Sequence, residues 1–408
     1  MKTKADVLIV GAGPTGLALA VALQQAGIDH LVIDRLAAGL NLSRAGVVHA
    51  HTLEMIEPLG VVPAMRAEGI EMARFGVRDR RHRLLTIDFA HLPSAYPFVL
   101  MVPQNVTERI LTERLEALGG TVHREVEALE IVQDKDGVTV RVAGPAGEQD
   151  IRARYVVGGD GLHSKVRAAS AIAFEGSSYE ERFVLADVSL AAPPQDSEVA
   201  LYFAPEGMVV FAPQPSGRYR VVATHATGGE NPDRAAIQKL LDTRGPEGEA
   251  PVVTEVHWSS AFRVHHRVAD RYRDGRLIVM GDAAHVHSPA GGQGMNTGLV
   301  DAVVLADRLV RVVGRGEGEA LLEDYGAMRR PAAVAVLGLA GRMTKLALVR
   351  GRVPRTLRNL LLRALGRMPW FQRKLAMQLS GLARRGFAEV SDPPALRKKD
   401  AAGLKLAA

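Results

Sequence analysis

Residues 276–302 read RLIVMGDAAHVHSPAGGQGMNTGLVDA. The apolar run 277–280 is typical of a short buried strand, and Gly281 and Asp282 follow it directly. Ligands of open α/β sheets bind at the carboxyl ends of the strands, so this carboxylate is placed where a ligand would lie. The loop 289–294 contains three glycines, which let a flat ligand approach the backbone without interference from Cβ atoms.

A helix is expected to begin close to Gly294, because Leu299, Val303 and Val304 recur at helical spacing. The first N–H groups of a helix have no partners within it and carry partial positive charge. They would stabilise a ring that becomes anionic on reduction. The stretch therefore predicts a flavin site.

The N-terminal segment contains a dinucleotide-binding pattern. An apolar strand over 6–10 runs into GAGPTG at 11–16, which has the form G-x-G-x-x-G, and a helix is expected over 17–25. A second strand over 31–34 ends in an acid, Asp34. This order of elements is specific for dinucleotide binding, and the acid favours a free 2′-hydroxyl, as in FAD or NAD.

Each glycine of this turn has its own expected role. Gly11 allows the tight turn, Gly13 the approach of a pyrophosphate, and Gly16 the close packing of helix on strand. Pro14 and Thr15 lie between them. A glycine turn without a ligand is the alternative, which the order of the elements disfavours.

A third strand, over 155–158, also ends in a glycine turn with an acid, Asp160, ahead of a short helix over 164–169. This position predicts a further ligand-binding edge. Residues 182–258 instead consist mostly of short strands separated by Pro and Gly turns, with one helix near 233–241. They predict an antiparallel sheet, which strands within 71–102 would join.

The composition is that of a globular protein, with 408 residues, 47% of them hydrophobic and 24% charged. The absence of cysteine excludes disulfides, a redox dithiol, cysteine-ligated metal and a cysteinyl-linked cofactor. No bound metal is expected. We see neither a signal segment before the first strand nor an apolar run long enough to span a bilayer, so we expect a cytoplasmic protein.

The glycine turn with Asp34, the turn with Asp160, and the stretch from Gly281 to Asn296 together resemble the single-component flavoprotein aromatic hydroxylases. These include 4-hydroxybenzoate hydroxylase, phenol hydroxylase and the polyketide hydroxylases. The resemblance covers residues 1 to about 340. It implies an α/β fold in which a Rossmann-like FAD-binding domain carries an inserted antiparallel-sheet substrate domain and C-terminal helices.

The expected domains follow these patterns. The FAD-binding domain takes residues 1–74, 98–181 and 259–341, and the substrate-binding sheet takes 75–97 and 182–258. Residues 342–390 form basic C-terminal helices, and 391–408 form a tail.

The resemblance also implies which residues hold non-covalent FAD. They are Gly11, Gly13, Pro14, Thr15, Gly16, Asp34, Arg35, Arg44, Gln104, Asp160, Gly281, Asp282, Gly294, Met295 and Asn296. Asp34 would bind the adenosine ribose and Asp282 the ribityl hydroxyls. Arg44 and Gln104 would bind the phosphates and ribityl chain.

Asp160 would lie by the pyrophosphate and the groove used by the nicotinamide cofactor, whose phosphates Arg35, Arg44 and His163 could contact. The backbone of Met295 and Asn296 would face the flavin ring. The carbonyl of Pro289 would lie near its reactive edge.

The implied activity is an FAD- and NAD(P)H-dependent monooxygenase, which inserts one oxygen atom from O2 into an aromatic substrate through a flavin hydroperoxide. The cofactor carries the difficult chemistry, and the protein orients the ring and excludes water. A reductase, halogenase or redox-neutral cyclase of the same fold is the alternative, and a non-catalytic binding protein is a third. The residues do not identify the base that would ionise a phenol, the oligomeric state, or the choice between NADH and NADPH.

The substrate is expected to be large and apolar. Ala212, Gln214 and Val222 stand where 4-hydroxybenzoate hydroxylase grips a carboxylate, and only Arg220 matches that clamp. A phenol, quinol, quinolone or polyketide is therefore favoured over a small benzoate. The expected pocket residues are Tyr202, Phe211, Arg220 and Pro289.

The C-terminal segment is strongly basic. Residues 342–408 carry a net charge of +13 and residues 1–341 a net charge of −7. Apolar residues at helical spacing, with Pro354 and Pro369 as breaks, predict about three helices. The favoured interpretation is that they pack their apolar stripe on the acidic body. The alternative is a weak peripheral contact with an anionic membrane; no nucleic-acid partner is expected.

Overall fold

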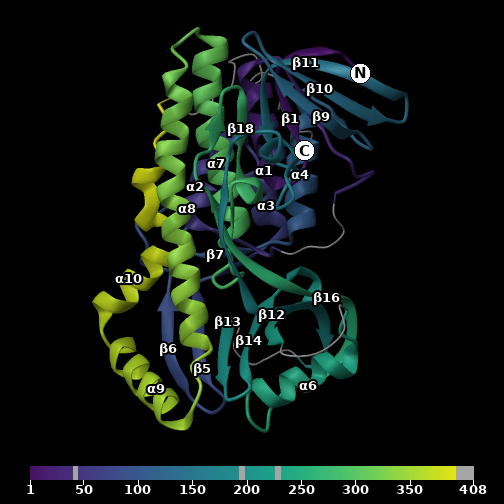
Figure 1. Cartoon of the computed structure of the whole chain (residues 1–408). Helices are drawn as coiled ribbons and strands as arrows, with labels where there is room; N and C mark the ends of the chain where they lie inside the picture. The colour runs from purple at the N-terminus through teal and green to yellow at the C-terminus, as the bar shows by residue number, and fades with distance from the viewer. Residues whose placement is uncertain (40–44, 193–197, 226–230, 392–408) are drawn as a thin grey trace, which may run out of the picture.

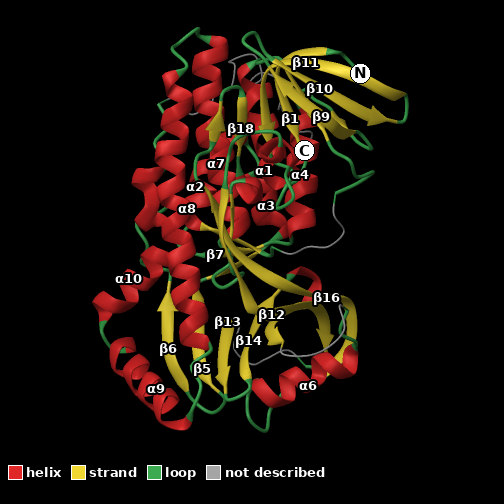
Figure 2. Cartoon of the chain, viewed as in Figure 1, coloured by secondary structure: helices red, strands yellow, loops and turns green. Residues whose placement is uncertain are grey.

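The computed structural model describes residues 1–39, 45–192, 198–225 and 231–391. The chain forms two lobes, each built on a sheet, and one long helix, α8 (Ala320–Ala347), runs along both of them (Figure 1). Helices gather around the sheet of the upper lobe, whereas strands dominate the lower lobe (Figure 2). This arrangement confirms the predicted α/β fold.

The upper sheet has a parallel centre in the order β18, β11, β1, β2, β8. These strands are β18 (Leu277–Val279), β11 (Gly147–Gly158), β1 (Lys4–Val10), β2 (His30–Ile33) and β8 (Val122–His123). Three further strands pair antiparallel: β17 (Arg273–Asp274) pairs with β18, β10 (Val138–Gly144) pairs with the first half of β11, and β9 (Glu127–Gln133) pairs with β10. Helices α1 (Pro14–Ala26) and α5 (Lys165–Ala168) pack against this sheet, and α4 (Gln104–Ala117) and α7 (Gly294–Leu309) pack against α1.

The lower sheet has the order β19, β16, β12, β15, β14, β13, β5, β6, and only the pair β13–β5 is parallel. Its strands are β19 (His285–Val286), β16 (Val253–Ala269), β12 (Phe174–Leu190), β15 (Tyr219–His225), β14 (Gly207–Pro213), β13 (Val199–Ala204), β5 (Arg74–Asp79) and β6 (Arg83–Asp88). Helix α6 (Arg234–Arg244) covers one face of it.

A third, small sheet connects the lobes. It consists of β3 (Val47–His49), β7 (Val99–Met101) and β4 (Ile70–Met72), with helices α2 (Ala50–Ile56) and α3 (Val62–Glu68) beside it. The strands β12 and β16, of 17 residues each, are long enough to extend from one lobe into the other.

Three of the predicted domain boundaries fall within elements that both lobes share. The boundary at 181/182 lies inside β12, that at 258/259 inside β16, and that at 341/342 inside α8. The lobes are therefore joined by continuous strands and a continuous helix as well as by loops. The division into domains stays a prediction.

The basic C-terminal segment forms the end of α8, then α9 (Arg352–Gly366) and α10 (Pro369–Leu379), followed by the short helix η5 (Leu382–Phe387). Within the described residues, no helix combines the length and the apolar character needed to cross a membrane. Helix α10 and η5 bury Ala376, Leu379 and Leu382, as the favoured interpretation requires.

For α9 that interpretation is wrong. Its apolar side chains Val353, Leu357, Leu360 and Leu361 are between 56% and 70% exposed. The helix buries the opposite side instead, because the body offers an aromatic ring and a carboxylate to its arginines there.

The first prediction concerns the packing of α1 on β1. A Cβ atom added at Gly16 would lie 1.9 Å from the carbonyl oxygen of Gly11, so Gly16→Ala must displace backbone. We expect a loss of unfolding free energy of about 3 kcal/mol or more, at the upper end for overpacking, and a lower midpoint in thermal unfolding. Gly318→Ala is the control, because an added Cβ there meets nothing within 4 Å. Equal midpoints for the two variants would contradict this packing.

Candidate active site

A single cavity of about 770 Å³ extends from the carboxyl ends of β1, β2 and β11 down to one face of the lower sheet. Its upper part is lined by the glycine turn after β1 and by the loop before α7, and its lower part by apolar side chains of the sheet. The cavity therefore joins all three motifs that the sequence singles out.

Two glycines of the turn after β1 differ in backbone conformation and in the space around them. Gly11 has φ +102°, and a Cβ atom there would lie 2.5 Å from the carbonyl oxygen of Gly159, so the turn of β1 packs directly on the turn of β11. Gly13, in contrast, has an ordinary φ of −76°, and a Cβ there would meet nothing within 4 Å. Gly13 thus borders open space at the N-terminus of α1, where a phosphate would be attracted by the N–H groups.

Asp34 supports this turn with both carboxylate oxygens. Its Oδ2 accepts a hydrogen bond from the Ala12 N–H at 2.6 Å, and its Oδ1 accepts one from the Leu36 N–H at 2.8 Å. Arg124 lies 3.8 Å from Oδ2. Since Asp34 also lines the cavity, it is positioned to offer a lone pair to a ribose hydroxyl while it holds the backbone in place.

Gln104 begins α4 and connects two further parts of the cavity wall. Its Oε1 accepts a hydrogen bond from the Ala45 N–H at 3.2 Å, and its Nε2 donates to Glu108 Oε1 at 2.9 Å. Burial raises the pKa of Glu108. Sequence reasoning missed Glu108, although its spacing of four residues from Gln104 on a helix places it on the same face.

Asp160 follows β11 and points its carboxylate into the protein. Its Oδ2 accepts a hydrogen bond from the Lys165 N–H at 2.7 Å, at the start of α5. Burial raises the pKa of this carboxyl group. Its Oδ1 is buried without a hydrogen-bond partner among the described residues, which is consistent with a contact that the protein atoms alone do not provide.

The turn that presents Asp282 is fixed from behind by a buried carboxylate. Asp301 Oδ2 accepts a hydrogen bond from the Gly281 N–H at 3.1 Å and lies 2.6 Å from His285 Nε2. Asp301 Oδ1 accepts one from Arg329 Nε at 2.7 Å. Burial alone would raise the pKa of Asp301, but His285 and Arg329 hold it below its usual value. Gly281 itself adopts φ +57°, which favours glycine at this point.

The loop before α7 is held by side chains on both sides. Asn296 donates to the carbonyl oxygens of Val47 and Gly292, at 2.9 and 2.7 Å, and accepts from the His49 N–H at 2.8 Å. The ring of His49 lies 2.8 Å from the Gly291 carbonyl oxygen, and burial lowers the pKa of His49 to about 4. The loop is therefore bound to β3 by neutral hydrogen bonds.

The C-terminal segment also forms hydrogen bonds with the loop before α7. Arg384 Nη2 donates to Gln293 Oε1 at 2.6 Å, and Gln293 Nε2 donates to the Leu379 carbonyl oxygen at 3.0 Å. Sequence reasoning missed this role of residues beyond 341, because nothing in their spacing indicates which loop they would contact.

The lower part of the cavity is predominantly apolar. Its wall includes Phe75, Leu185, Leu201, Met208, Val210, Ala212, Val222, Phe262, Met343 and Ala347. Met343 and Ala347 come from α8, and the others listed come from the lower sheet. An aromatic molecule larger than a single ring would bury its surface favourably here.

Two of the expected pocket residues lie elsewhere, and the prediction for them is wrong. Tyr202 and Phe211 pack edge to face at 5.9 Å in the core beneath α6, on the other side of the lower sheet. Because side chains alternate along a strand, their neighbours Leu201, Val210 and Ala212 face the cavity instead.

Pro289 and Arg220 do line the cavity. Arg220 donates to both oxygens of Asp187, each at 2.8 Å, and its side chain is 4% exposed. Its remaining nitrogen, Nη1, is buried without a partner among the described residues. An acceptor on a bound molecule would satisfy it.

The expected cofactor contacts fall into three groups. Those that line the cavity are Gly11, Gly13, Pro14, Thr15, Asp34, Arg35, Gln104, Asp160, Asp282, Gly294 and Met295, and His163 lines it too. Gly16, Gly281 and Asn296 lie directly behind that surface. Arg44 lies outside the described residues. Within the described part of the chain, no three His, Asp or Glu side chains gather as metal ligands.

Comparisons with known proteins identify the family of the chain. Residues 4–340 match the FAD binding domain family. The 6-methylpretetramide 4-monooxygenase of Streptomyces rimosus is 37% identical over 352 residues, which cover 85% of this chain and 63% of that protein. The pentachlorophenol 4-monooxygenase of Sphingobium chlorophenolicum is 34% identical over 343 residues, covering 82% of this chain and 63% of that protein. The structure of p-nitrophenol 4-monooxygenase from Pseudomonas putida has a TM-score of 0.86 at 26% identity, covering 93% of this chain and 99% of that one.

The fold is that of a mixed α/β flavoprotein, with a parallel sheet that carries the dinucleotide turn and a second, mostly antiparallel sheet. The chain belongs to the FAD binding domain family, within the superfamily of FAD-dependent aromatic hydroxylases. It spans 63% of the length of each of the two sequence relatives named above.

The second prediction tests the open space at Gly13. Gly13→Val should leave the fold intact, because the backbone conformation is ordinary and an added Cβ meets nothing within 4 Å. It should nevertheless lower FAD affinity by at least about tenfold, since the side chain would occupy the path of the pyrophosphate. Flavin content and far-ultraviolet circular dichroism measure the two effects. Full flavin occupancy in the variant would refute the assignment.

The third prediction concerns Asp282. Asp282→Ala should weaken FAD binding about 10- to 100-fold, because a charge-assisted hydrogen bond contributes about 1.5–3 kcal/mol. Fluorescence titration of the apoprotein with FAD measures the change. Asp282→Asn is the matched control, since it keeps an acceptor and should recover part of the affinity. If the alanine variant binds FAD as tightly as the unchanged protein, Asp282 does not contact the cofactor.

Proposed function

We propose that this chain is an FAD-dependent monooxygenase that takes electrons from NAD(P)H and inserts one oxygen atom of O2 into a lipophilic aromatic substrate. The observation that carries the proposal is the continuity of one cavity, from the dinucleotide turn at Gly13, past the loop at Pro289, into the apolar chamber. The relatives named above are monooxygenases, which favours hydroxylation over a reductase, halogenase or cyclase reaction.

The proposed cofactor contacts divide along the cavity. Asp34 would hold the adenosine ribose, the turn at Gly13 and the N-terminus of α1 the pyrophosphate, and Asp282 the ribityl chain. The N–H groups at the start of α7, from Gly294 onward, would face the ring. FAD supplies electron transfer and oxygen activation when it is bound.

The chain's own contribution is position and exclusion of water. Asp301, behind the turn, and Asn296, behind the loop, hold the backbone in one geometry. The apolar wall orients the aromatic ring and displaces water that would divert activated oxygen to peroxide. Arg220, held rigidly by Asp187, supplies a cation beside this chamber, where it could stabilise a phenolate or a carbonyl oxygen.

A screen of NADH and NADPH oxidation against phenols, quinols, quinolones and polyketides tests the function. We expect oxidation stimulated by a large apolar phenol and a product that carries one oxygen atom derived from labelled O2. Flavin-loaded protein that gives no oxygenated product with any member of the panel, but catalyses another transformation of one of them, would overturn the proposal.

The fourth prediction separates the two faces of the lower sheet. Val210→Phe narrows the chamber, so NAD(P)H oxidation should continue while hydrogen peroxide replaces most of the hydroxylated product. Tyr202→Phe changes the opposite face, in the core beneath α6, and should leave the ratio of product to NAD(P)H consumed unchanged. Peroxide release and product yield are measured together. Uncoupling by Tyr202→Phe but not by Val210→Phe would show that the substrate binds on the face of the sheet beneath α6 and would contradict this assignment.

A further inference from the structure

We propose that the outward face of α9, continued by the start of α10, docks on an anionic lipid surface. Apolar side chains are exposed throughout this segment: seven of the thirteen exposed large hydrophobic residues within the described part of the chain lie between 346, at the end of α8, and 370, at the start of α10. They are Leu346, Val353, Leu357, Leu360, Leu361, Met368 and Trp370. A cluster of this kind marks an interaction site, whereas single exposed apolar residues are normal.

Helix α9 buries Leu362 but leaves most of its apolar side chains exposed, unlike an ordinary surface helix. Arg358 is buried, with its guanidinium 4.3 Å from the centre of the Phe203 ring, and it donates to the Leu346 carbonyl oxygen at 3.1 Å. Arg363 and Asn359 lie 3.6 and 3.2 Å from Asp79 Oδ2. These polar contacts, together with the buried side chain of Leu362, fix the helix to the body, while Leu357, Leu360 and Leu361 stay exposed. A surface helix normally buries the apolar face, so this orientation indicates a second, apolar partner.

The charges around this face identify the partner. Residues 342–385 contain twelve Lys and Arg and no Asp or Glu. Among the described residues, the exposed cations Arg350, Arg367, Arg373 and Lys374 form no ion pair. Leucines flanked by cations, with a tryptophan 60% exposed at Trp370, suit the boundary between acyl chains and anionic headgroups.

A second copy of the chain fits this face less well. A symmetric dimer would bring the same patch of both subunits together. Two faces rich in cations and lacking carboxylates would then be opposed, at a cost from like-charge repulsion. Anionic lipid instead neutralises the same cations and contributes about 1 kcal/mol for each Lys or Arg near the surface.

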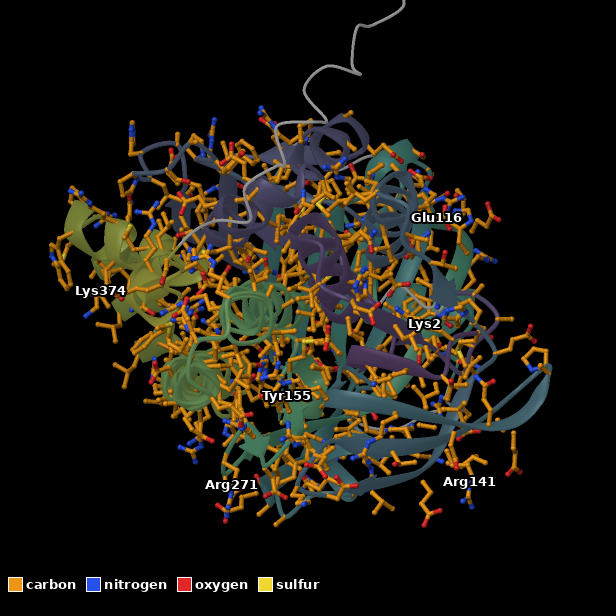
Figure 3. The ribbon with its side chains drawn as sticks, turned by 90° about the horizontal axis from the view of Figure 1, so that it is seen from above. Lys2, Glu116, Arg141, Tyr155, Arg271 and Lys374 are labelled. Atoms are coloured by element: carbon orange, nitrogen blue, oxygen red, sulfur yellow. The ribbon has the colours of Figure 1, made fainter. Side chains whose placement is uncertain are left out.

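The position of the helices allows contact with a flat surface. Helices α9 and α10 form the outer edge of the lower lobe, beside β6 (Figure 1). Lys374 lies at the periphery when the molecule is viewed from above (Figure 3). A bilayer could therefore approach α9 without contacting the upper lobe.

Cosedimentation of the flavin-loaded full chain with vesicles tests the proposal. We expect binding to an equal mixture of phosphatidylcholine and phosphatidylglycerol, little binding to phosphatidylcholine alone, and release as salt shortens the Debye length below about 10 Å. The double variant Leu357→Glu with Leu361→Glu should lower the affinity at least about 100-fold, since each leucine contributes roughly a factor of ten.

The matched control is Leu129→Glu with Val132→Glu. These two residues are 41% and 55% exposed on β9, in the upper lobe, and their substitution should leave vesicle binding unchanged. Flavin content and the thermal midpoint verify that both double variants are folded. No binding of the unchanged protein to anionic vesicles, or equal loss of binding in both double variants, would overturn the proposal. A dimer that the α9 variant dissociates, without vesicle binding, would show that the face binds a second copy instead.

Discussion

The buried carboxylate of Asp301 is the group on which the cofactor end of the molecule depends. It binds the backbone of Gly281, the ring of His285 and the guanidinium of Arg329, and none of its side chain is exposed. Arg329 in turn donates to the carbonyl oxygen of Phe387 at 2.8 Å. One charge thus connects the turn after β18, the first half of α7, the long helix α8 and the C-terminal segment. Loss of the Asp301 carboxylate would leave the buried guanidinium of Arg329 without its ion-pair partner.

The two lobes are coupled because the lower sheet continues into the cofactor loop. Strand β16 pairs with β19, which lies only three residues before Pro289. Strand β12 leads from the upper lobe into the centre of the same sheet. The wall of the apolar chamber and the loop that would face the flavin ring are therefore parts of one hydrogen-bonded structure. This rigidity suits a reaction that depends on the position of the substrate and on exclusion of water.

Helix α8 relates the chamber to the exposed apolar face. Met343 and Ala347 line the cavity, while Leu346, on the same turn, is 38% exposed. The chain then passes directly into α9. A lipophilic substrate and a lipid-facing helix would thus be placed on two sides of one element, which relates the proposed chemistry to the proposed docking surface.

Much of the fold followed from local sequence, because each feature is decided within a few residues. The dinucleotide turn is specified by Gly11, Gly13 and Gly16, which lie between the end of the buried strand β1 and the first turn of α1. Gly281 and Asp282 likewise mark the end of β18. The helix start at Gly294 was predicted because the apolar spacing changes there from strand to helix. Proline positions likewise indicated three C-terminal helices.

Only the tertiary structure decided which face of a strand or helix contacts the cavity, the core or solvent. Along β13 and β14 both faces are apolar, so periodicity could not show that Leu201 and Val210 face the chamber while Tyr202 and Phe211 lie beneath α6. In α9 the amphipathic pattern was correct, but its orientation was reversed, since Phe203 and Asp79, distant in sequence, bind its arginines. The sequence by itself determined the local geometry and the cofactor class. The substrate chamber and the outward leucines depend on long-range contacts, which no local pattern records.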